Sequence, residues 1–135
     1  MGLDITLVQF SHALSDETRL RILHLVNDEA LCVCELADIL RMPQSSVSSH
    51  VQVLRNAGLL ASERCEKWIY YRLERRYRSL FATLGKFFAL SADDDSTLKP
   101  DAMRARIRLA QREQSCWPGP TVLDEAASRG KRQGA

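Results

Sequence analysis

Residues 32–71 constrain the fold more than any other part of this 135-residue chain. Two segments with apolar side chains at helical spacing lie on either side of a short turn at 41–43, and the second helix is expected over 44–57. Two runs typical of strands follow at 59–64 and 68–73, with three residues between them. The order of elements is therefore two helices and then a strand pair.

The second helix of this pattern has an apolar side and a short polar side. Val47, Val51 and Leu54 form the side expected to be buried, and Gly58 follows as a left-handed cap. Two helices followed by a strand pair form a winged helix-turn-helix, in which the second helix enters the DNA major groove and the wing reaches the flanking backbone. The side chains expected to contact DNA are Gln44, Ser45, Ser48, Ser49, Gln52, Arg55, Arg64 and Lys67.

The chemistry of these side chains suits a DNA duplex. Short hydroxyl side chains allow close approach, and Gln52 can form paired hydrogen bonds with adenine. Arg64 and Lys67 suit contacts to phosphate or the minor groove. Residues 41–78 carry eight basic and three acidic side chains, a net charge of +5, whereas residues 1–40 carry two basic and seven acidic, a net charge of −5. Such a basic block favours a phosphate-facing surface.

The rest of the sequence predicts a mainly α-helical chain with a small two-stranded β wing. Helices are expected over 4–14, from an N-cap at Ser15 to about Asn27, over 31–40 and over 77–90. The helix over 77–90 is more apolar than a solvated helix should be, which suggests that another surface covers it.

Three parts are expected along the chain. Residues 1–91 form the DNA-binding and dimerisation domain, 92–117 a linker and an amphipathic C-terminal helix, and 118–135 a disordered tail. The C-terminal helix is expected to bury Met103, Ile107 and Ala110. No run approaches the ~18 apolar residues of a membrane span, and no secretory signal stands at the N-terminus. A cytoplasmic location is therefore expected.

Four cysteines, Cys32, Cys34, Cys65 and Cys116, are expected to be reduced in such a chain. Cys32 stands three residues before Glu35, so a thiol occupies the usual position of a capping hydroxyl. The helix dipole should lower the pKa of both thiols of the first pair, and thiolates bind soft ions such as trivalent arsenic or antimony. Residues two apart on a helix point about 200° apart, so one ion bridging both thiols should distort the first turn and move the second helix. The alternative is that both are small buried hydrophobes.

Three separated motifs resemble one known family. They are Leu14-Ser15-Asp16-Glu17-Thr18-Arg19-Leu20-Arg21-Ile22-Leu23, then Gln44-Ser45-Ser46-Val47-Ser48-Ser49-His50 with Leu54-Arg55 and Gly58-Leu59-Leu60, and then Trp68-Ile69-Tyr70-Tyr71-Arg72-Leu73. Over about residues 5–90 the chain resembles the ArsR/SmtB family of metal-sensing repressors. The resemblance implies a homodimer, formed by the first helix and the long apolar helix, that holds a two-fold operator until an inducer binds. The family usually has Gly near the wing tip, where this chain has Glu66 and Lys67.

The run Leu31-Cys32-Val33-Cys34-Glu35-Leu36 resembles the arsenic-responsive branch, in which paired cysteines precede this helix. That branch often has a third cysteine three positions after the second, where this chain has Ala37. A third ligand is then expected from Cys116 first, next from an external thiol or hydroxide, and last from Cys65, which should lie far away at the wing tip. The family's zinc site on the long helix needs His, Asp or Glu, and residues 77–90 contain none of these.

The expected function is a metalloid-responsive transcriptional repressor. As the apo homodimer it would bind double-stranded operator DNA, and it would dissociate on binding As(III) or Sb(III) through Cys32, Cys34 and Cys116. No permanent cofactor, membrane partner or small-molecule substrate is expected. A thiol redox or reactive-sulfur switch of the same fold is the alternative. An enzyme is not expected, because a thiol oxidoreductase would need Cys-x-x-Cys beside a βαβ unit.

Overall fold

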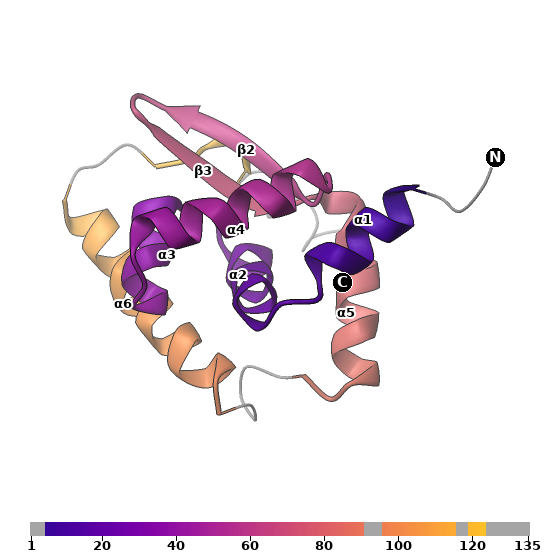
Figure 1. The fold of residues 1–135 in the computed structure, drawn as a ribbon. Helices are drawn as coiled ribbons and strands as arrows, with labels where there is room; N and C mark the ends of the chain where they lie inside the picture. Colours follow the sequence, from indigo (N-terminus) through magenta and orange to yellow (C-terminus); the bar gives the residue numbers. More distant parts are fainter. Residues whose placement is uncertain (1–4, 91–95, 116–118, 124–135) are drawn as a thin grey trace.

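The computed structural model describes residues 5–90, 96–115 and 119–123, and it is mainly helical (Figure 1). In chain order the elements are α1 (Ile5–Ala13), α2 (Glu17–Asp28), β1 (Leu31–Cys32), α3 (Val33–Leu40), α4 (Gln44–Asn56), β2 (Leu60–Cys65), β3 (Trp68–Leu73), α5 (Arg75–Phe87) and α6 (Leu98–Gln114). Helices α3 and α4, followed by the β2–β3 hairpin, confirm the predicted winged helix-turn-helix. None of the described helices is long and apolar enough to cross a lipid bilayer.

The wing belongs to a sheet of three strands rather than the predicted two. β1 pairs antiparallel with β3, so that the strand order is β1-β3-β2, and Cys32 lies opposite Tyr70. The prediction placed residues 31 and 32 at the start of a helix, whereas Cys32 is extended, with φ −90° and ψ 168°. The hairpin closes through Glu66 and Lys67, and Glu66 takes a φ of 55° without the help of a glycine.

The ends of the helices depend on local hydrogen bonds. The N-cap of α2 is Asp16, whose carboxylate accepts the backbone N–H of Arg19 at 3.0 Å, and not Ser15 as predicted. Ser15 instead donates its hydroxyl to the carbonyl of His12. Gly58 has a φ of 75° after α4, which confirms the predicted left-handed cap.

Helices α2, α3 and α4 contribute to one core, in which α4 packs against both α2 and α3. Val47, Val51 and Leu54 of α4 are buried there, as their spacing predicted. The buried Arg19 joins the first two helices, because its guanidinium donates to the carbonyls of Ala13 and His12 at 2.9 and 3.0 Å. The recognition helix α4 is therefore seated on a well-packed base.

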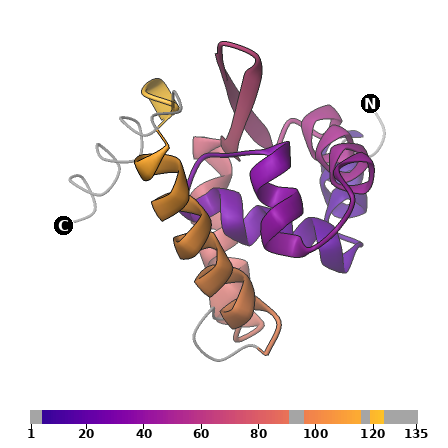
Figure 2. The ribbon, with the colours of Figure 1, turned by 90° about the vertical axis from the view of Figure 1, so that its left-hand side faces the viewer.

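Helix α6 packs against α2 and α3 (Figure 2), but through a different side from the one predicted. Met103 and Ile107 are 56% and 60% exposed. The buried side carries Leu98, Asp101 and Ala105. Asp101 is buried because it accepts both ends of the Arg21 guanidinium at 2.8 and 2.9 Å and a third bond from Arg104 at 2.6 Å.

Three arginines of α6, four residues apart, extend this attachment along α3. Arg104 donates to the carbonyl of Ile39, Arg108 pairs with Asp38, and Arg112 pairs with Glu35. We call Arg104, Arg108 and Arg112 the arginine ladder. Residues four apart lie on one face of a helix, so ion pairs rather than apolar spacing decide which face of α6 is turned inward.

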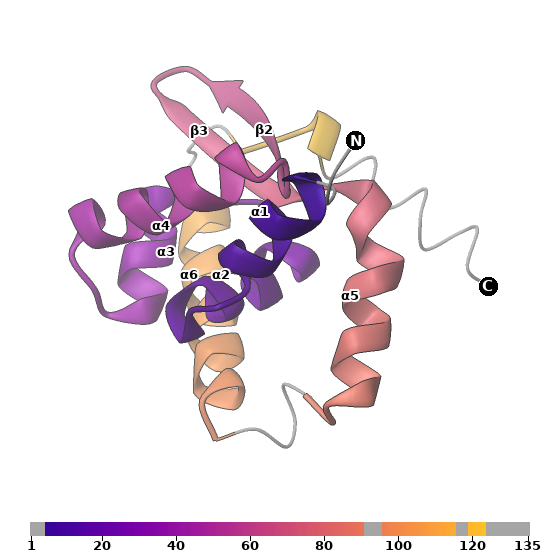
Figure 3. The same ribbon diagram turned by 45° about the vertical axis from the view of Figure 1, so that its right-hand side comes forward.

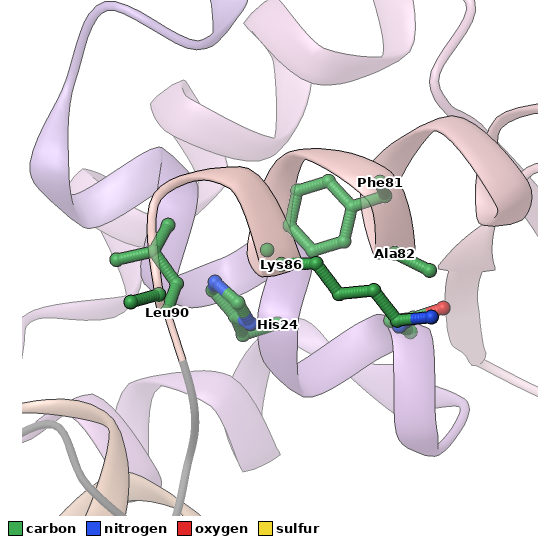
Figure 4. Close-up of a pocket in the computed structure, with 8 residues that line it drawn as sticks. His24, Phe81, Ala82, Lys86 and Leu90 are labelled. Carbon is green, nitrogen blue, oxygen red and sulfur yellow. The ribbon is translucent and has the colours of Figure 1, made fainter.

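Helix α5 stands apart from the body of the protein (Figure 3). Within the described chain it is held by Phe81 against His24, with ring centroids 4.9 Å apart, and by Tyr77 against Phe10 at 5.5 Å. A cavity of about 360 Å³ lies between α5 and α2 (Figure 4). Large apolar side chains of both α5 and α1 are exposed, namely Leu7, Val8, Leu80, Phe87 and Phe88. These are the two helices expected to form the dimer interface.

Some predicted features lie outside the described residues. These are Cys116, the acidic run at 93–95, and the chain beyond residue 123. Residues 119–123 were assigned to a disordered tail, yet they lie against the wing. There the carboxylate of Glu63 accepts the backbone N–H groups of Thr121, Val122 and Leu123 at 2.7–3.1 Å.

Candidate functional site

The outer face of α4 carries the side chains predicted to contact DNA. Gln44, Ser45, Ser48, Ser49, Gln52 and Arg55 are all exposed. Gln52 donates its amide to Asn56 at 2.9 Å, and Ser49 donates its hydroxyl to the carbonyl of Ser45. These contacts hold the polar groups on the surface, where base edges can replace them.

The β2–β3 hairpin projects from the body of the protein (Figure 2). Arg64 and Lys67 are exposed near its tip. Arg64 donates to the carbonyl of Glu66 at 3.0 Å, and the ammonium of Lys67 lies 4.8 Å from the centre of the Trp68 ring. We call the exposed predicted contact residues of α4 and of the wing tip the recognition surface.

The two thiols at the start of α3 lie together. Cys32 is buried, Cys34 is half-buried, and their sulfur atoms are 3.0 Å apart. The prediction that they point in opposite directions is wrong. It applied the helical rotation to both residues, whereas Cys32 is in the extended strand β1 and only Cys34 is in the helix.

The expectation for the acidity of Cys32 is also wrong. Burial raises the pKa of the Cys32 thiol, and its contact with Cys34 and the nearby Glu35 carboxylate raise it further. The helix N-terminus was expected to lower this pKa, but desolvation and a neighbouring negative charge outweigh it. Cys32 is therefore a protonated thiol at neutral pH.

Glu35 connects the thiol pair to α6. Its carboxylate accepts the backbone N–H of Cys32 at 3.1 Å, as the capping pattern predicted. Arg112 donates to both oxygens of the same carboxylate at 2.7 and 2.6 Å, and to the carbonyl of Ala30 at 2.7 Å. The Arg112 guanidinium also lies 4.9 Å from the centre of the Tyr70 ring. Arg112 was not among the predicted site residues, although the four-residue spacing of the arginine ladder was a signal for it.

An open groove brings the thiol pair to the recognition surface. It has a volume of about 730 Å³, and its lining includes Cys32, Cys34, Gln44, Lys67 and Trp68. Gln44 begins the recognition helix and Lys67 lies at the wing tip, so a group bound to the two sulfurs would border both parts of the recognition surface. This groove was not predicted from the sequence, because it depends on how β1 joins the sheet.

Cys65 is nearer to the thiol pair than the sequence suggested. It ends β2 and packs against the small cluster formed by Ala30, Cys32 and Tyr70. Its sulfur lies 3.1 Å from the Glu63 carboxylate and 3.4 Å from the carbonyl of Gly119. Burial, followed by the bond to Glu63, raises the pKa of this thiol to about 11.

Among the described residues, no group of three or more His, Cys, Asp or Glu side chains could hold a metal ion. The described residues therefore offer two neighbouring thiols, and not a complete set of three ligands. Cys116, the predicted third ligand, lies outside the described residues. Along the chain, the nearest described residues are Ser115, three positions after Arg112, and Gly119, whose carbonyl contacts Cys65.

Comparison with known proteins places these features in context. Residues 16–62 match the family described as bacterial regulatory protein, arsR family. The chain is 36% identical over 103 residues to the arsenic resistance transcriptional regulator ArsR1 of Pseudomonas putida, covering 76% of this chain and 78% of that one. It is 42% identical over 67 residues to the arsenical resistance operon repressor of Escherichia coli, and this match covers 49% of this chain and 57% of that protein. The fold resembles the homodimeric winged helix-turn-helix domain Mb0332 of Mycobacterium bovis, with a TM-score of 0.60 at 26% identity over 62% of this chain and 79% of that one.

The position of the two sulfurs predicts that one reagent can bridge them without unwinding α3. A protein with Cys65→Ser and Cys116→Ser should bind one equivalent of phenylarsine oxide, which joins two neighbouring thiols. Far-UV circular dichroism should then stay unchanged, because Cys32 is extended before the reagent arrives.

A further Cys34→Ser change in the same protein should let a monothiol remove the reagent. Loss of helical signal equal to about one turn, roughly four residues, on bridging would contradict the observed geometry and revive the strain mechanism.

Proposed function

The chain belongs to the arsR family of bacterial regulatory proteins, and from this premise we propose that it is a metalloid-responsive transcriptional repressor. Its relatives are transcriptional regulators and not enzymes. As the apo homodimer it holds a two-fold operator, and binding of As(III) or Sb(III) releases the DNA. The observation that carries this proposal is the 3.0 Å separation of the Cys32 and Cys34 sulfurs in a groove shared with Gln44 and Lys67.

The thiol pair has the chemistry that a trivalent metalloid needs. Thiolate sulfur is the soft ligand that soft ions prefer. Zinc binds cysteine sulfur at about 2.3 Å, and an ion at that distance from both sulfurs would hold them about 3.3–3.8 Å apart. The sulfurs are 3.0 Å apart in the free protein, so they would need to separate by less than about 1 Å.

The protonated state of Cys32 also suits this ligand. In neutral solution arsenous acid carries three hydroxyl groups and no charge. Each thiol gives up its proton as its sulfur binds arsenic, and that proton leaves with one arsenic hydroxyl as water. Two thiols therefore form two As–S bonds and release two waters. No oxidation state changes. A divalent cation must instead expel protons from the same thiols into solution.

The link from inducer to operator runs through the groove. A metalloid on Cys32 and Cys34 would occupy space beside Gln44, at the start of the recognition helix, and beside Lys67 on the wing. Helix α3 is also joined to α4 by only three residues and packs against it. We propose that the bound inducer disturbs both DNA-contacting parts directly, without the unwinding of α3 that the sequence suggested.

The dimer is proposed to form through α1 and α5. Both helices expose apolar side chains, among them Val8 and Phe87, the latter 79% exposed. A solvated helix does not gain from such side chains, whereas a partner would bury them. A two-fold axis through this interface would present the two α4 helices to successive turns of the major groove.

The third ligand is proposed to be Cys116. Residues 116–118 lie between Ser115 and Gly119. The carbonyl of Gly119 is 3.4 Å from the Cys65 sulfur, and Ser115 donates its hydroxyl to the backbone carbonyl of Arg112, whose side chain reaches Ala30. An external thiol or hydroxide is the second possibility. Cys65 remains third, because its sulfur contacts Glu63 instead of the pair.

A thiol redox or reactive-sulfur switch remains the second candidate function. The same 3.0 Å separation that admits a bridging ion places two sulfurs within reach of a disulfide. Arsenite that releases DNA under strict reduction by a phosphine favours the metalloid sensor. Release by peroxide alone favours the switch.

Serine variants test the proposed inducer site. Cys32→Ser with Cys34→Ser should keep the operator affinity of the parent within about threefold, because neither side chain is on the outer face of α4, but should lose release by As(III). Fluorescence anisotropy with an operator selected from random duplexes measures both properties.

Cys65→Ser is the matched control and should still release the operator at the parent's As(III) concentration. If the double variant at 32 and 34 releases its operator as the parent does, the proposed inducer site is wrong.

Cys116→Ser tests the third ligand. X-ray absorption of the As(III)-bound protein should change from three sulfur neighbours to two sulfurs and one oxygen, and the affinity should fall by at least about tenfold, the scale on which even outer-shell partners of a metal act. An unchanged coordination number in this variant would assign the third position to a ligand other than Cys116.

Two substitutions on the recognition surface test the DNA contacts. Gln52→Ala should relax the preference at one base pair of each half-site and cost about 1–3 kcal/mol on the selected operator. Lys67→Ala should weaken binding to all sequences alike and reduce the salt-dependence slope by about one per protomer.

Arg106→Ala, on the exposed side of α6, is the control and should change neither property. The assignment of α4 to the major groove fails if Gln52→Ala leaves the base preference at every position of the half-site as it was.

A further inference from the structure

A buried carboxylate lies directly beside the thiol pair. Glu35 is 2% exposed and accepts the backbone N–H of Cys32 at 3.1 Å. It is also the sequence neighbour of Cys34. A charge inside a protein acts on its surroundings more strongly than one in water, so an unpaired Glu35 would favour any cation that bound to the two sulfurs.

Arg112 cancels this charge. Its guanidinium binds both carboxylate oxygens of Glu35, at 2.7 and 2.6 Å, in the two-pronged geometry that arginine alone among basic side chains offers. A further bond to the carbonyl of Ala30 and its position over the Tyr70 ring fix it in place. The thiol pair therefore faces a carboxylate whose charge is opposed by a guanidinium bound to both of its oxygens.

The other members of the arginine ladder bind different carboxylates. Arg108 pairs with Asp38, whose side chain is 65% exposed, and Arg104 binds Asp101 and the carbonyl of Ile39. All three arginines attach α6 to α3, but Arg112 alone among them reaches the residue that holds Cys32. Substitution of Arg108 or Arg112 can therefore distinguish the attachment of α6 to α3 from the balance of the Glu35 charge.

We propose that Arg112, by neutralising Glu35, makes the thiol pair select uncharged metalloid hydroxides over divalent cations. The proposal rests on the metalloid-binding function proposed above and deepens it. Arsenous acid is neutral and exchanges its hydroxyls for the two thiols with release of water, so the charge of Glu35 matters little to it. A divalent cation bound to the same sulfurs gains from every negative charge nearby.

The preference is measured as the ratio of Cd(II) affinity to As(III) affinity, by calorimetric titration of the full-length protein at one pH. In Arg112→Met this ratio should rise about tenfold or more, because Glu35 is left unpaired. Arg112→Lys keeps the positive charge and should hold the ratio within about threefold of the parent. Arg108→Met removes one ladder arginine without touching Glu35 and should leave the ratio within about twofold.

Glu35→Gln gives the opposite charge change. It leaves Arg112 unpaired beside the thiols, so the ratio should fall below that of the parent. A structural role for the pair would weaken the binding of both ligands in both variants and leave the ratio alone. If Arg112→Met does not fold, as judged by its thermal unfolding, Glu35→Gln decides the question by itself.

The inference is overturned if folded Arg112→Met leaves the ratio unchanged, or if Arg108→Met shifts the ratio as much as Arg112→Met does. Where Glu35→Gln is the only one of the two pair variants that folds, an unchanged ratio in Glu35→Gln overturns the inference. Failure of the proposed function looks different. A parent that binds no As(III), or a Cys32→Ser and Cys34→Ser protein that still binds it, refutes the metalloid site whatever the ratio does.

Discussion

The carboxylate of Glu35 is the group on which the candidate sensor depends. It is bound on one side by the backbone N–H of Cys32 and on the other by the guanidinium of Arg112. The first bond fixes where the strand ends and α3 begins, and so brings the two sulfurs together. The second fixes α6 against α3. Removing the side chain of either Glu35 or Arg112 leaves the other as a buried charge without compensation, which costs several kcal/mol in typical proteins.

This arrangement makes the proposed inducer site and the recognition surface neighbours in space as well as in sequence. The thiol pair shares its groove with the first residue of α4 and with the wing tip. The distance over which an inducer must act is therefore short. No chain of coupled residues across the protein is needed to explain how a bound metalloid affects operator binding.

The sequence predicted those parts of the structure that follow from local periodicity. Val47, Val51 and Leu54 indicated the helix that became α4, and Gly58 indicated its end. The two strand-like runs on either side of Glu66 indicated the wing. It did not predict the two-residue strand at Cys32, because two residues carry no periodicity. The predicted direction of the sulfur atoms and the predicted lowering of the Cys32 pKa were therefore wrong. Both properties depend on tertiary burial and on a partner strand.

The ladder of arginines on α6 lies wholly outside residues 16–62, the segment that the family shares. The side chain that balances the charge beside the thiols can therefore change while every base-contacting residue stays the same. Selection for a different toxic element and selection for a different promoter would then act on separate stretches of one gene, and each could proceed without undoing the other.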